Sequence, residues 1–341
     1  MPLADLPVPL DLSPMEAKLV EAVPTGAGWR FEPKWDGFRC LAFRSGDEVA
    51  LKAKSGKPLN RFFPDVVAAL KALPADRFVV DGELTIEVDG APSFEALQMR
   101  LHPAASRVAK LAAEHPAGLM LFDCLMDAQG RSLLDAPLSD RRKALEALVK
   151  RFGKAKVVRL SPGTTDRAKA CAWLEDLGSH LDGVIAKRLD GPYVPGERAM
   201  QKIKKIRTAD CVVGGFRYAE GTKLVGSLLL GLYDDEGRLN HVGFTSTIRH
   251  AERPELTAKL LKLKGEGFTG DAPGGPSRWS TQRSGEWVAL KLALVVEVAY
   301  DQVTGGRFRH GTRLVRWRPD KAPAQCTMAQ IARPADLSPT S

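Results

Sequence analysis

The pattern of apolar segments changes near Lys205, and this change limits the folds that the chain can adopt. Before Lys205, short apolar runs typical of strands alternate with segments whose apolar residues recur at helical spacing. After it, strand-like runs follow one another and only one helix is expected. The first pattern predicts an α+β domain, and the second predicts a small β-barrel of the OB type.

The expected elements of the first domain are strands at 78–80, 119–122 and 184–186 and helices at 64–73, 139–152 and 165–177. The helix at 139–152 begins with Ser139 and Asp140, residue types that cap helices. The expected elements of the second domain are strands at 211–214, 226–233, 239–244 and 287–300, a hairpin turn at 234–237, a helix at 254–264 and a Pro/Gly-rich loop at 270–280.

The length of 341 residues fits two domains. We expect an N-terminal extension at 1–13, a first domain at 14–206, a second domain at 207–333 and a flexible tail at 334–341. No long apolar stretch predicts a membrane helix, and the first residues lack a basic leader, so a cytoplasmic location is expected by default.

Charge and cysteine content narrow the class of protein. A formal net charge of +9 and a pI of about 9.3 suit a polyanionic partner such as nucleic acid, although a basic protein without such a partner remains an alternative. The five cysteines are scattered and include no Cys-x-x-Cys pair. We therefore expect free thiols rather than disulfides or a zinc site.

The segment 31–39 carries the signature Lys34-x-Asp36-Gly37-x-Arg39. A lysine amine can attack the α-phosphate of a nucleotide and hold the nucleotide as a phosphoramide, provided that the amine is uncharged. Desolvation or nearby cations would favour that form. Taken alone, the tetrapeptide Lys-x-Asp-Gly is more often a surface turn.

Two later motifs are expected at strand ends. Asp81, Gly82 and Glu83 follow the apolar run 78–80, and a carboxylate there could meet a ribose hydroxyl or a metal-bound water. Phe122 ends the next run, where its ring could stack on a base. The alternatives are a solvated turn for the acids and an ordinary core residue for the phenylalanine.

Three further motifs carry charge. Asp182 enters and Lys187 leaves one apolar strand, which suits an acid that holds Mg²⁺ and an amine that meets phosphate. Lys202 and Lys204 would project from the same side of a strand and form a site for the α-phosphate. The segment 316–321 could grip the β- and γ-phosphates. Each has a plain alternative, namely polar strand ends or a basic surface.

In this order, the motifs resemble those of ATP-dependent DNA ligases of the nucleotidyltransferase superfamily, especially the small bacterial ligases of the ligase C type and the ligase module of ligase D. The resemblance spans about 14–321, and the strands at 214–216 and 227–231 resemble the start of the family's OB domain. It implies a nucleotidyltransferase (adenylation) domain at 14–206 and an OB-fold domain at 207–333.

The resemblance also implies a role for each matching residue. Lys34 would be adenylated, and Lys202 and Lys204 would contact the α-phosphate. Glu32 and Phe122 would contact the adenine, and Arg39 would contact the nucleotide or the DNA 5′-phosphate. Glu83 would bind ribose and metal, Asp182 would bind metal, and Lys187 would contact the nucleotide. The leaving pyrophosphate would be oriented by Arg318, Asp320 and Lys321.

Three positions depart from the family pattern. Lys54 replaces the arginine of an Arg-x-Gly segment that contacts nucleotide or DNA, and lysine cannot make the same bidentate contacts. Asp182 replaces a glutamate and is one methylene shorter, and Met200 stands where an aromatic residue is usual.

The resemblance implies ATP and Mg²⁺ as cofactors, with Mn²⁺ as a possible substitute, and nicked duplex DNA as the partner. Lys34 would take AMP from ATP and pass it to the 5′-phosphate at a nick. The 3′-hydroxyl at the nick would then displace AMP and seal the strand. We expect a monomer that binds DNA through basic surfaces, serves in DNA repair alongside other repair proteins, and works at the nucleoid. The alternatives are an RNA ligase, a GTP-using capping enzyme, or a non-catalytic nucleic-acid-binding protein on this scaffold.

Overall fold

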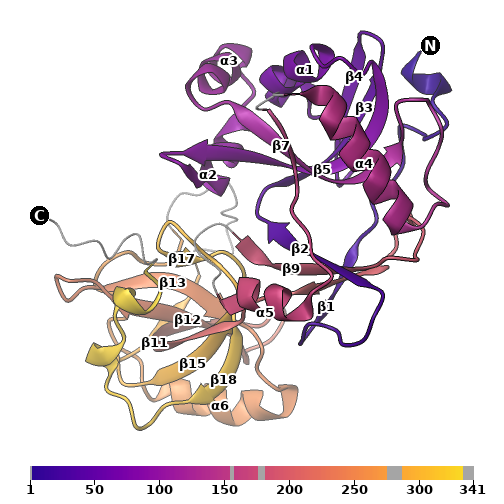
Figure 1. Ribbon diagram of the computed structural model, residues 1–341. Helices are drawn as coiled ribbons and strands as arrows, with labels where there is room; N and C mark the ends of the chain where they lie inside the picture. Colours follow the sequence, from indigo (N-terminus) through magenta and orange to yellow (C-terminus); the bar gives the residue numbers. More distant parts are fainter. Residues whose placement is uncertain (1, 154–156, 176–180, 275–285, 333–341) are drawn as a thin grey trace, which may run out of the picture. The chain divides into compact units, whose positions relative to one another are not determined.

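The computed structural model describes residues 2–153, 157–175, 181–274 and 286–332. The chain divides into two compact units, Met1–Lys205 and Ile206–Ser341 (Figure 1). In the described part of the chain, no helix is long and apolar enough to cross a membrane. All five cysteines are free thiols, as expected.

The first unit contains two sheets. One has the order β4-β3-β5-β7-β8, with the short strand β6 beside β5; the other has the order β1-β10-β9-β2. Neighbours are antiparallel except for the parallel pairs β7–β8 and β1–β10. The strands are β1 (Ala17–Val20), β2 (Trp29–Trp35), β3 (Phe38–Ser45), β4 (Glu48–Ala53), β5 (Arg77–Val88), β6 (Ala91–Pro92), β7 (Ala117–Met126), β8 (Val158–Leu160), β9 (Leu181–Arg188) and β10 (Met200–Ile203).

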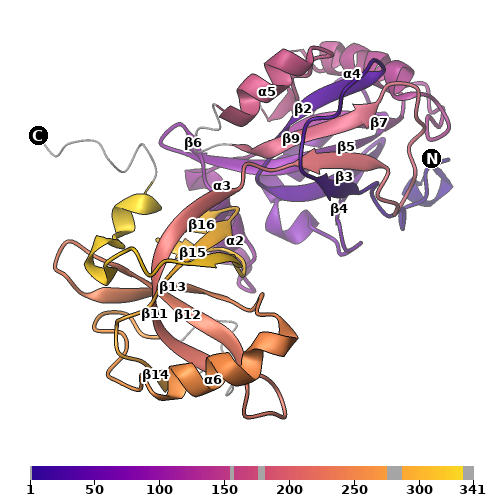
Figure 2. The same cartoon turned by 90° about the horizontal axis from the view of Figure 1, so that it is seen from below.

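Helices cover both sheets of this unit. They are α1 (Pro64–Lys71), α2 (Phe94–Arg100), α3 (Ala105–Glu114), α4 (Leu138–Phe152) and α5 (Arg167–Glu175). Leu145, Leu148 and Phe152 recur at helical spacing on α4 and enter the main core with β7. On α5, Ala170 packs with Phe31 of β2 and Val184 of β9, and Figure 2 shows α5 along these strands.

The segment 1–13, expected as an extension, contributes to the core of the first unit. Leu6 and Val8 are buried with Leu41 and Phe43 of β3. Burial of these aliphatic side chains stabilises the segment on the sheet by roughly 1.5–3 kcal/mol for each fully buried residue. The same segment leads directly into residues 14–17, which line the cleft described below.

Three local predictions were wrong. β5 and β7 continue through Asp81, Glu83 and Phe122, so these residues lie inside strands and not at their ends. The acids that interrupt the apolar runs, Asp81 and Asp123, are buried inside these strands, where they pair with Arg39 and Arg141. Pro137 precedes α4 and no side chain caps it, so Ser139 does not have the expected capping role. Lys204 lies one residue beyond β10.

The second unit is mostly β-structure. One sheet has the order β13-β12-β11-β15-β18, with β14 beside β11, and β16 pairs with β17. The elements are β11 (Arg207–Tyr218), β12 (Val225–Tyr233), β13 (Leu239–Thr245), α6 (Arg253–Leu261), β14 (Val288–Ala289), β15 (Val295–Tyr300), β16 (Val303–Thr304), β17 (Arg307–Phe308) and β18 (Arg313–Trp317). This order is consistent with the expected OB-type domain, although the pairings among the described residues do not close a barrel.

The expected hairpin at 234–237 joins β12 and β13. The Asp234 carboxylate accepts hydrogen bonds from the backbone N–H groups of Glu236 and Arg238, which stabilises the turn. Most of the expected loop at 270–280 and the tail at 334–341 lie outside the described residues.

Candidate active site

A cleft in the first unit is lined by residues from both of its sheets. It contains eight of the site residues predicted from the sequence: Glu32, Lys34, Arg39, Lys54, Glu83, Phe122, Lys187 and Lys202. Its other walls are Pro14, Met15, Glu16, Ala17, Pro33, Trp35, Ile185 and Met200. The fold thus gathers at one place the charged and aromatic residues that are scattered along the sequence.

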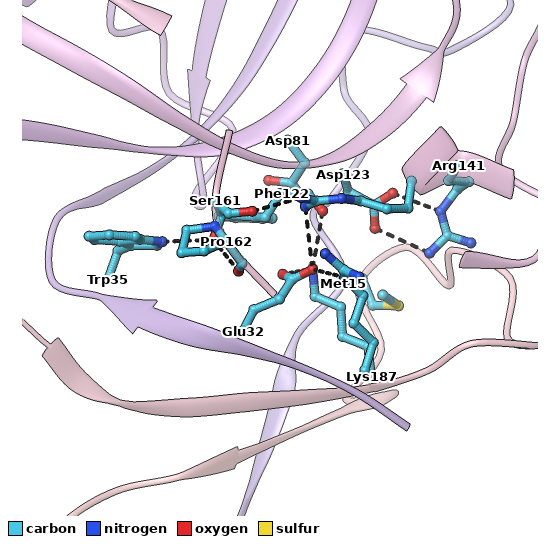
Figure 3. Close-up of polar contacts among 12 residues, drawn as sticks. Met15, Glu32, Trp35, Asp81, Phe122, Asp123, Arg141, Ser161, Pro162 and Lys187 are labelled. Atoms are coloured by element: carbon cyan, nitrogen blue, oxygen red, sulfur yellow. Dashed lines mark hydrogen bonds and ion pairs between the residues drawn. The ribbon is translucent and has the colours of Figure 1, made fainter. Parts of the chain in front are cut away.

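Lys34 lies near the end of β2, at an irregularity in the pairing of β2 with β9. Such bulges redirect side chains and are frequent beside active sites. β2 is an edge strand, where the neighbouring Pro33 is tolerated. The indole N–H of Trp35 donates to Ser161 Oγ at 2.9 Å and fixes the end of the strand (Figure 3).

Glycine allows the lysine motif to approach β5. A Cβ atom at Gly37 would lie 2.1 Å from the carbonyl oxygen of Leu84, so no other residue fits without a shift of the backbone. Leu84 follows Glu83 on β5. The glycine of the signature therefore brings the Lys34 turn close to the strand that carries the Glu83 carboxylate.

Asp182 on β9 connects two of the predicted lysines. Its carboxylate forms an ion pair with Lys34, and its Oδ2 atom also lies 3.2 Å from Lys204 Nζ. The next residue, Gly183, has φ of +141°, and a Cβ there would lie 2.0 Å from the carbonyl oxygen of Ile203. Only glycine permits this close approach of β9 to the end of β10.

Lys202 completes a cluster of ammonium groups. Burial lowers its pKa, and the positive charges of Lys34 and Lys204 lower it further. Because β10 ends at Ile203, Lys202 and Lys204 do not alternate on one strand as predicted, but the charge of Lys204 still acts on Lys202. Three cations near one another suit a phosphate group, which would relieve their mutual repulsion.

Glu32 lies at another part of the cleft and is only 2% exposed. Its carboxylate oxygens lie 2.7 Å from Lys187 Nζ, 3.0 Å from Arg30 Nε and 3.8 Å from Arg142 Nη1. Lys187 also donates to the carbonyl oxygen of Phe122 at 3.3 Å (Figure 3). Lys187 is therefore held by Glu32, although the sequence had suggested a phosphate contact for it.

Phe122 presents a partly exposed ring on β7. The Lys187 ammonium and the central carbon of the Arg39 guanidinium each lie 4.7 Å from the ring centroid. Cations at this distance are attracted by the ring face. The three side chains form one wall on which a planar base could stack.

Arg39 is held by a network that sequence reasoning missed. Its Nε and Nη2 atoms each donate to the fully buried Asp81 carboxylate at 2.6 Å. Tyr193 O–H donates to the same carboxylate at 2.6 Å and accepts from the backbone N–H of Met15 at 2.9 Å. The signal was Asp81 itself, because an acid within an apolar strand needs partners.

The two acids predicted to hold a divalent ion are Glu83, which lines the cleft, and Asp182, which is ion-paired with the cleft residue Lys34. Burial raises the pKa of Glu83 to about 7, against the opposing effect of the Arg39 and Lys34 charges. Among the described residues, no group of three or more His, Cys, Asp or Glu could hold a metal alone. Mg²⁺ commonly takes one or two carboxylates and completes its shell with phosphate oxygens and water, so this donor set fits it.

Lys54 lies at the open edge of the cleft. Its ammonium is 2.9 Å from Glu16 Oε1, and its side chain is mostly exposed. Lysine is expected to make fewer contacts here than the arginine of the family pattern, and this ion pair is consistent with that expectation.

The predicted residues of the second unit surround an acid that was not predicted. Arg318, Asp320 and Lys321 follow β18, and both cations bond the Asp210 carboxylate on β11. Arg318 also pairs with Asp320 at 2.9 Å and holds the pKa of Asp320 down at about 2. No local sequence signal marked Asp210, because Arg318 lies 108 residues further along the chain.

Comparisons with known proteins match both units. The model of the ATP dependent DNA ligase domain matches residues 14–205, and that of the ATP dependent DNA ligase C terminal region matches 221–321. The chain is 44% identical to DNA ligase C1 of Mycolicibacterium smegmatis over 343 residues, which cover 97% of this chain and 96% of that protein.

Two further matches agree with this result. DNA ligase C of Mycobacterium tuberculosis is 42% identical over 354 residues, covering 98% of this chain and 97% of that protein. A solved structure from a study of Lig E DNA ligases, described as binding DNA with a minimal scaffold, has a TM-score of 0.56 and 17% identity. It covers 89% of this chain and 99% of that chain, and it supports the fold alone.

Proposed function

The chain belongs to the ATP-dependent DNA ligase family and is an ATP-dependent DNA ligase, and from this premise we propose that Lys34 is the residue that carries AMP. In the first step, the uncharged Lys34 amine attacks the α-phosphorus of ATP. An N–P bond forms, and the bond from this phosphorus to the bridging oxygen breaks. The amine loses a proton and pyrophosphate leaves with the electron pair.

The observation that carries the proposal is the ion-paired cluster at the end of β2. Asp182 holds both Lys34 and Lys204, and Lys202 lies near enough that their charges lower its pKa. An α-phosphate that enters this cluster would meet Lys202 and Lys204 and lie beside the attacking amine. Their positive charge would stabilise the negative charge that develops during phosphoryl transfer.

Asp182 and Glu83 would hold Mg²⁺ together with oxygens of the nucleotide. When bound, Mg²⁺ would neutralise charge on the phosphates and so favour departure of pyrophosphate. Lys34 and Lys204 both contact the Oδ2 atom of Asp182, so its Oδ1 atom would be the oxygen that faces the ion.

The base would lie against the wall formed by Phe122, Lys187 and Arg39, with the Glu32 carboxylate as a hydrogen-bond acceptor for its amino group. Glu32 is rigid, because three cations fix its oxygens. Glu83 would reach the ribose, and Lys54 would add a single charge at the open edge of the cleft. In the second unit, Arg318 and Lys321 would orient the pyrophosphate in the same step, and Asp320 would hold Arg318 until the phosphates arrive.

Duplex DNA is the substrate of a DNA ligase, and we assign to this chain the sealing of nicks that carry a 5′-phosphate and a 3′-hydroxyl. Arg39 would contact the 5′-phosphate during AMP transfer, because Asp81 and Tyr193 hold its guanidinium in the cleft. The 3′-hydroxyl would then attack the activated phosphate and displace AMP.

A single nick requires one active site, so we assign a monomer. A role in DNA repair follows by analogy with minimal ligases.

The test is a sealing assay on a duplex with one nick, with ATP and Mg²⁺. We expect sealing by the unmodified chain and none by Lys34→Ala. Lys110→Ala is the matched control, since Lys110 is an exposed lysine of α3 in the same unit. Sealing by Lys34→Ala at the normal rate would overturn the proposal, and preferential sealing of nicked RNA would reassign the substrate.

A further inference from the structure

We propose that Asp210 is a positioning residue for the pyrophosphate leaving group: it holds Arg318 and Lys321 together so that both cations address the same phosphates. The inference rests on the proposed function of Arg318 and Lys321 in the first step. It adds a residue from β11, remote in sequence from those cations, and predicts that this residue matters only when ATP or pyrophosphate reacts.

The contacts define Asp210 as the shared anchor of the two cations. Arg318 Nη1 donates to Asp210 Oδ1 at 2.8 Å and to Oδ2 at 3.0 Å. Lys321 Nζ donates to the same Oδ2 at 2.8 Å. Without this carboxylate, two like charges at such short range would repel one another, and their flexible side chains would separate.

Arg318 has a second acidic partner of a different kind. Its Nε and Nη2 atoms donate to Asp320 at 2.9–3.2 Å. The side chain of Asp320 is 60% exposed, whereas that of Asp210 is 11% exposed. Exposed ion pairs contribute little and exchange readily, while a buried pair is costly to break.

This difference predicts which partner gives way to substrate. A guanidinium has five N–H groups, and Asp210 and Asp320 together occupy the Nε, Nη1 and Nη2 atoms of Arg318. An incoming phosphate can gain a bidentate contact by replacing the exposed Asp320. Asp210 would remain in place and keep the Arg318 fork oriented toward the phosphate.

The backbone around Asp210 is fixed on both sides. The Gln330 side chain accepts from the Asp210 N–H and donates to the Asp210 carbonyl oxygen, each at 3.0 Å. On the neighbouring strand, Glu297 is the cross-strand partner of Asp210 and pairs with Arg316 at 2.6 Å. The carboxylate of Asp210 is thus presented from a rigid strand, as a positioning residue requires.

The variant Asp210→Asn tests the inference, because asparagine keeps the shape of the side chain and removes its charge. Three reactions are measured on the full chain: adenylation by ATP, loss of AMP from the adenylated enzyme in pyrophosphate, and sealing of a nick that already carries AMP. We expect kcat/KM for adenylation to fall by about tenfold to a hundredfold. The pyrophosphate reaction should fall by the same factor, and sealing of the pre-adenylated nick should be unchanged.

Glu255→Gln is the matched control, since it removes an exposed acid from α6 of the same unit and should leave all three reactions intact. Equal adenylation by Asp210→Asn and the unmodified chain would overturn the inference. So would an equal loss of all three reactions, which would indicate a structural role.

If Asp210→Asn does not fold, Asp210→Glu decides the question. This variant retains the charge and displaces it by one methylene, so adenylation should fall while sealing of the pre-adenylated nick persists. Adenylation at the normal rate by Asp210→Glu, or a matching loss of sealing, would contradict the inference. Failure of the unmodified chain to adenylate would instead overturn the proposed function.

Discussion

Lys34 of β2 and Asp182 of β9 form an ion pair, and the same Asp182 carboxylate binds Lys204. One acid thus connects the proposed nucleophile with a cation of the proposed α-phosphate site. The attack needs a lone pair on the Lys34 nitrogen, so Lys34 must give up its contact with Asp182 before the N–P bond forms.

The variant Asp182→Asn tests this relationship. We expect single-turnover adenylation to fall by about two orders of magnitude, because the charge proposed to bind Mg²⁺ is lost. Asp182→Glu, which lengthens the side chain by one methylene, should keep most of the activity and change the relative response to Mg²⁺ and Mn²⁺. Adenylation by Asp182→Asn with normal rate and metal dependence would show that the acid has no such role.

Tyr193→Phe removes the hydroxyl that bonds both Asp81 and Met15. We expect the free energy of unfolding to fall by about 1–3 kcal/mol, because buried polar groups lose their partner. AMP transfer to nicked DNA should also slow, because Arg39 depends on the orientation of Asp81. The measurements are urea unfolding and the rate of AMP transfer by the adenylated enzyme.

Tyr218→Phe is the control for this experiment, because Tyr218 is exposed in the second unit. It should leave both the unfolding curve and the transfer rate unchanged. A Tyr193→Phe protein with unchanged stability and unchanged transfer would contradict the role given to the network.

The raised pKa of Glu83 predicts that the free energy of unfolding depends on pH. Burial raises its pKa from 4.5 to about 7 in the folded chain, so between these values the folded state holds a proton that the unfolded state has lost. The free energy of unfolding should therefore fall as the pH rises through this window. Glu83→Gln removes the effect and should be more stable than the unmodified chain above pH 7, by at most about 3 kcal/mol.

The test is chemical unfolding of both proteins without metal at about pH 5 and pH 8. The stability advantage of Glu83→Gln should be small at the lower pH and larger at the higher pH. An advantage of the same size at both values would mean that the Glu83 charge is not the cause.

Arg141 and Asp123 form a buried ion pair behind the cleft, and each side chain is 1% exposed (Figure 3). Arg141→Met should lower the free energy of unfolding by about 3–5 kcal/mol, because the Asp123 charge is left buried without compensation. The double variant with Asp123→Asn should recover part of this loss. Urea unfolding that gives the same midpoint for Arg141→Met and the unmodified chain would contradict this reasoning.

Much of the architecture was accessible from the sequence. The α+β class, the resemblance to ATP-dependent DNA ligases and the ligase activity are confirmed by the matches to both ligase domain models and to mycobacterial DNA ligases. The motifs were readable because short segments such as 32–39 and 182–187 each carry several residues of one site. The roles of the individual residues stay predictions.

Other features depend on contacts between distant segments. Tyr193 bonds Asp81, 112 residues away, and Asp210 bonds Arg318, 108 residues away. Sequence periodicity predicts helices and strands, but it does not predict contacts between residues so far apart in the chain. The ends of β5 and β7 were misplaced for a related reason, because the acids Asp81 and Asp123 were taken to end the apolar runs, whereas both lie inside the strands.

Incubation with ATP labelled at the α-phosphate, in the presence of Mg²⁺, tests the central claim most directly. The account predicts that label becomes bound to the unmodified chain through an acid-labile bond, that peptide mapping places it on Lys34, and that Lys34→Ala binds none. Label that is absent from the unmodified chain, or that persists in Lys34→Ala, would contradict the account.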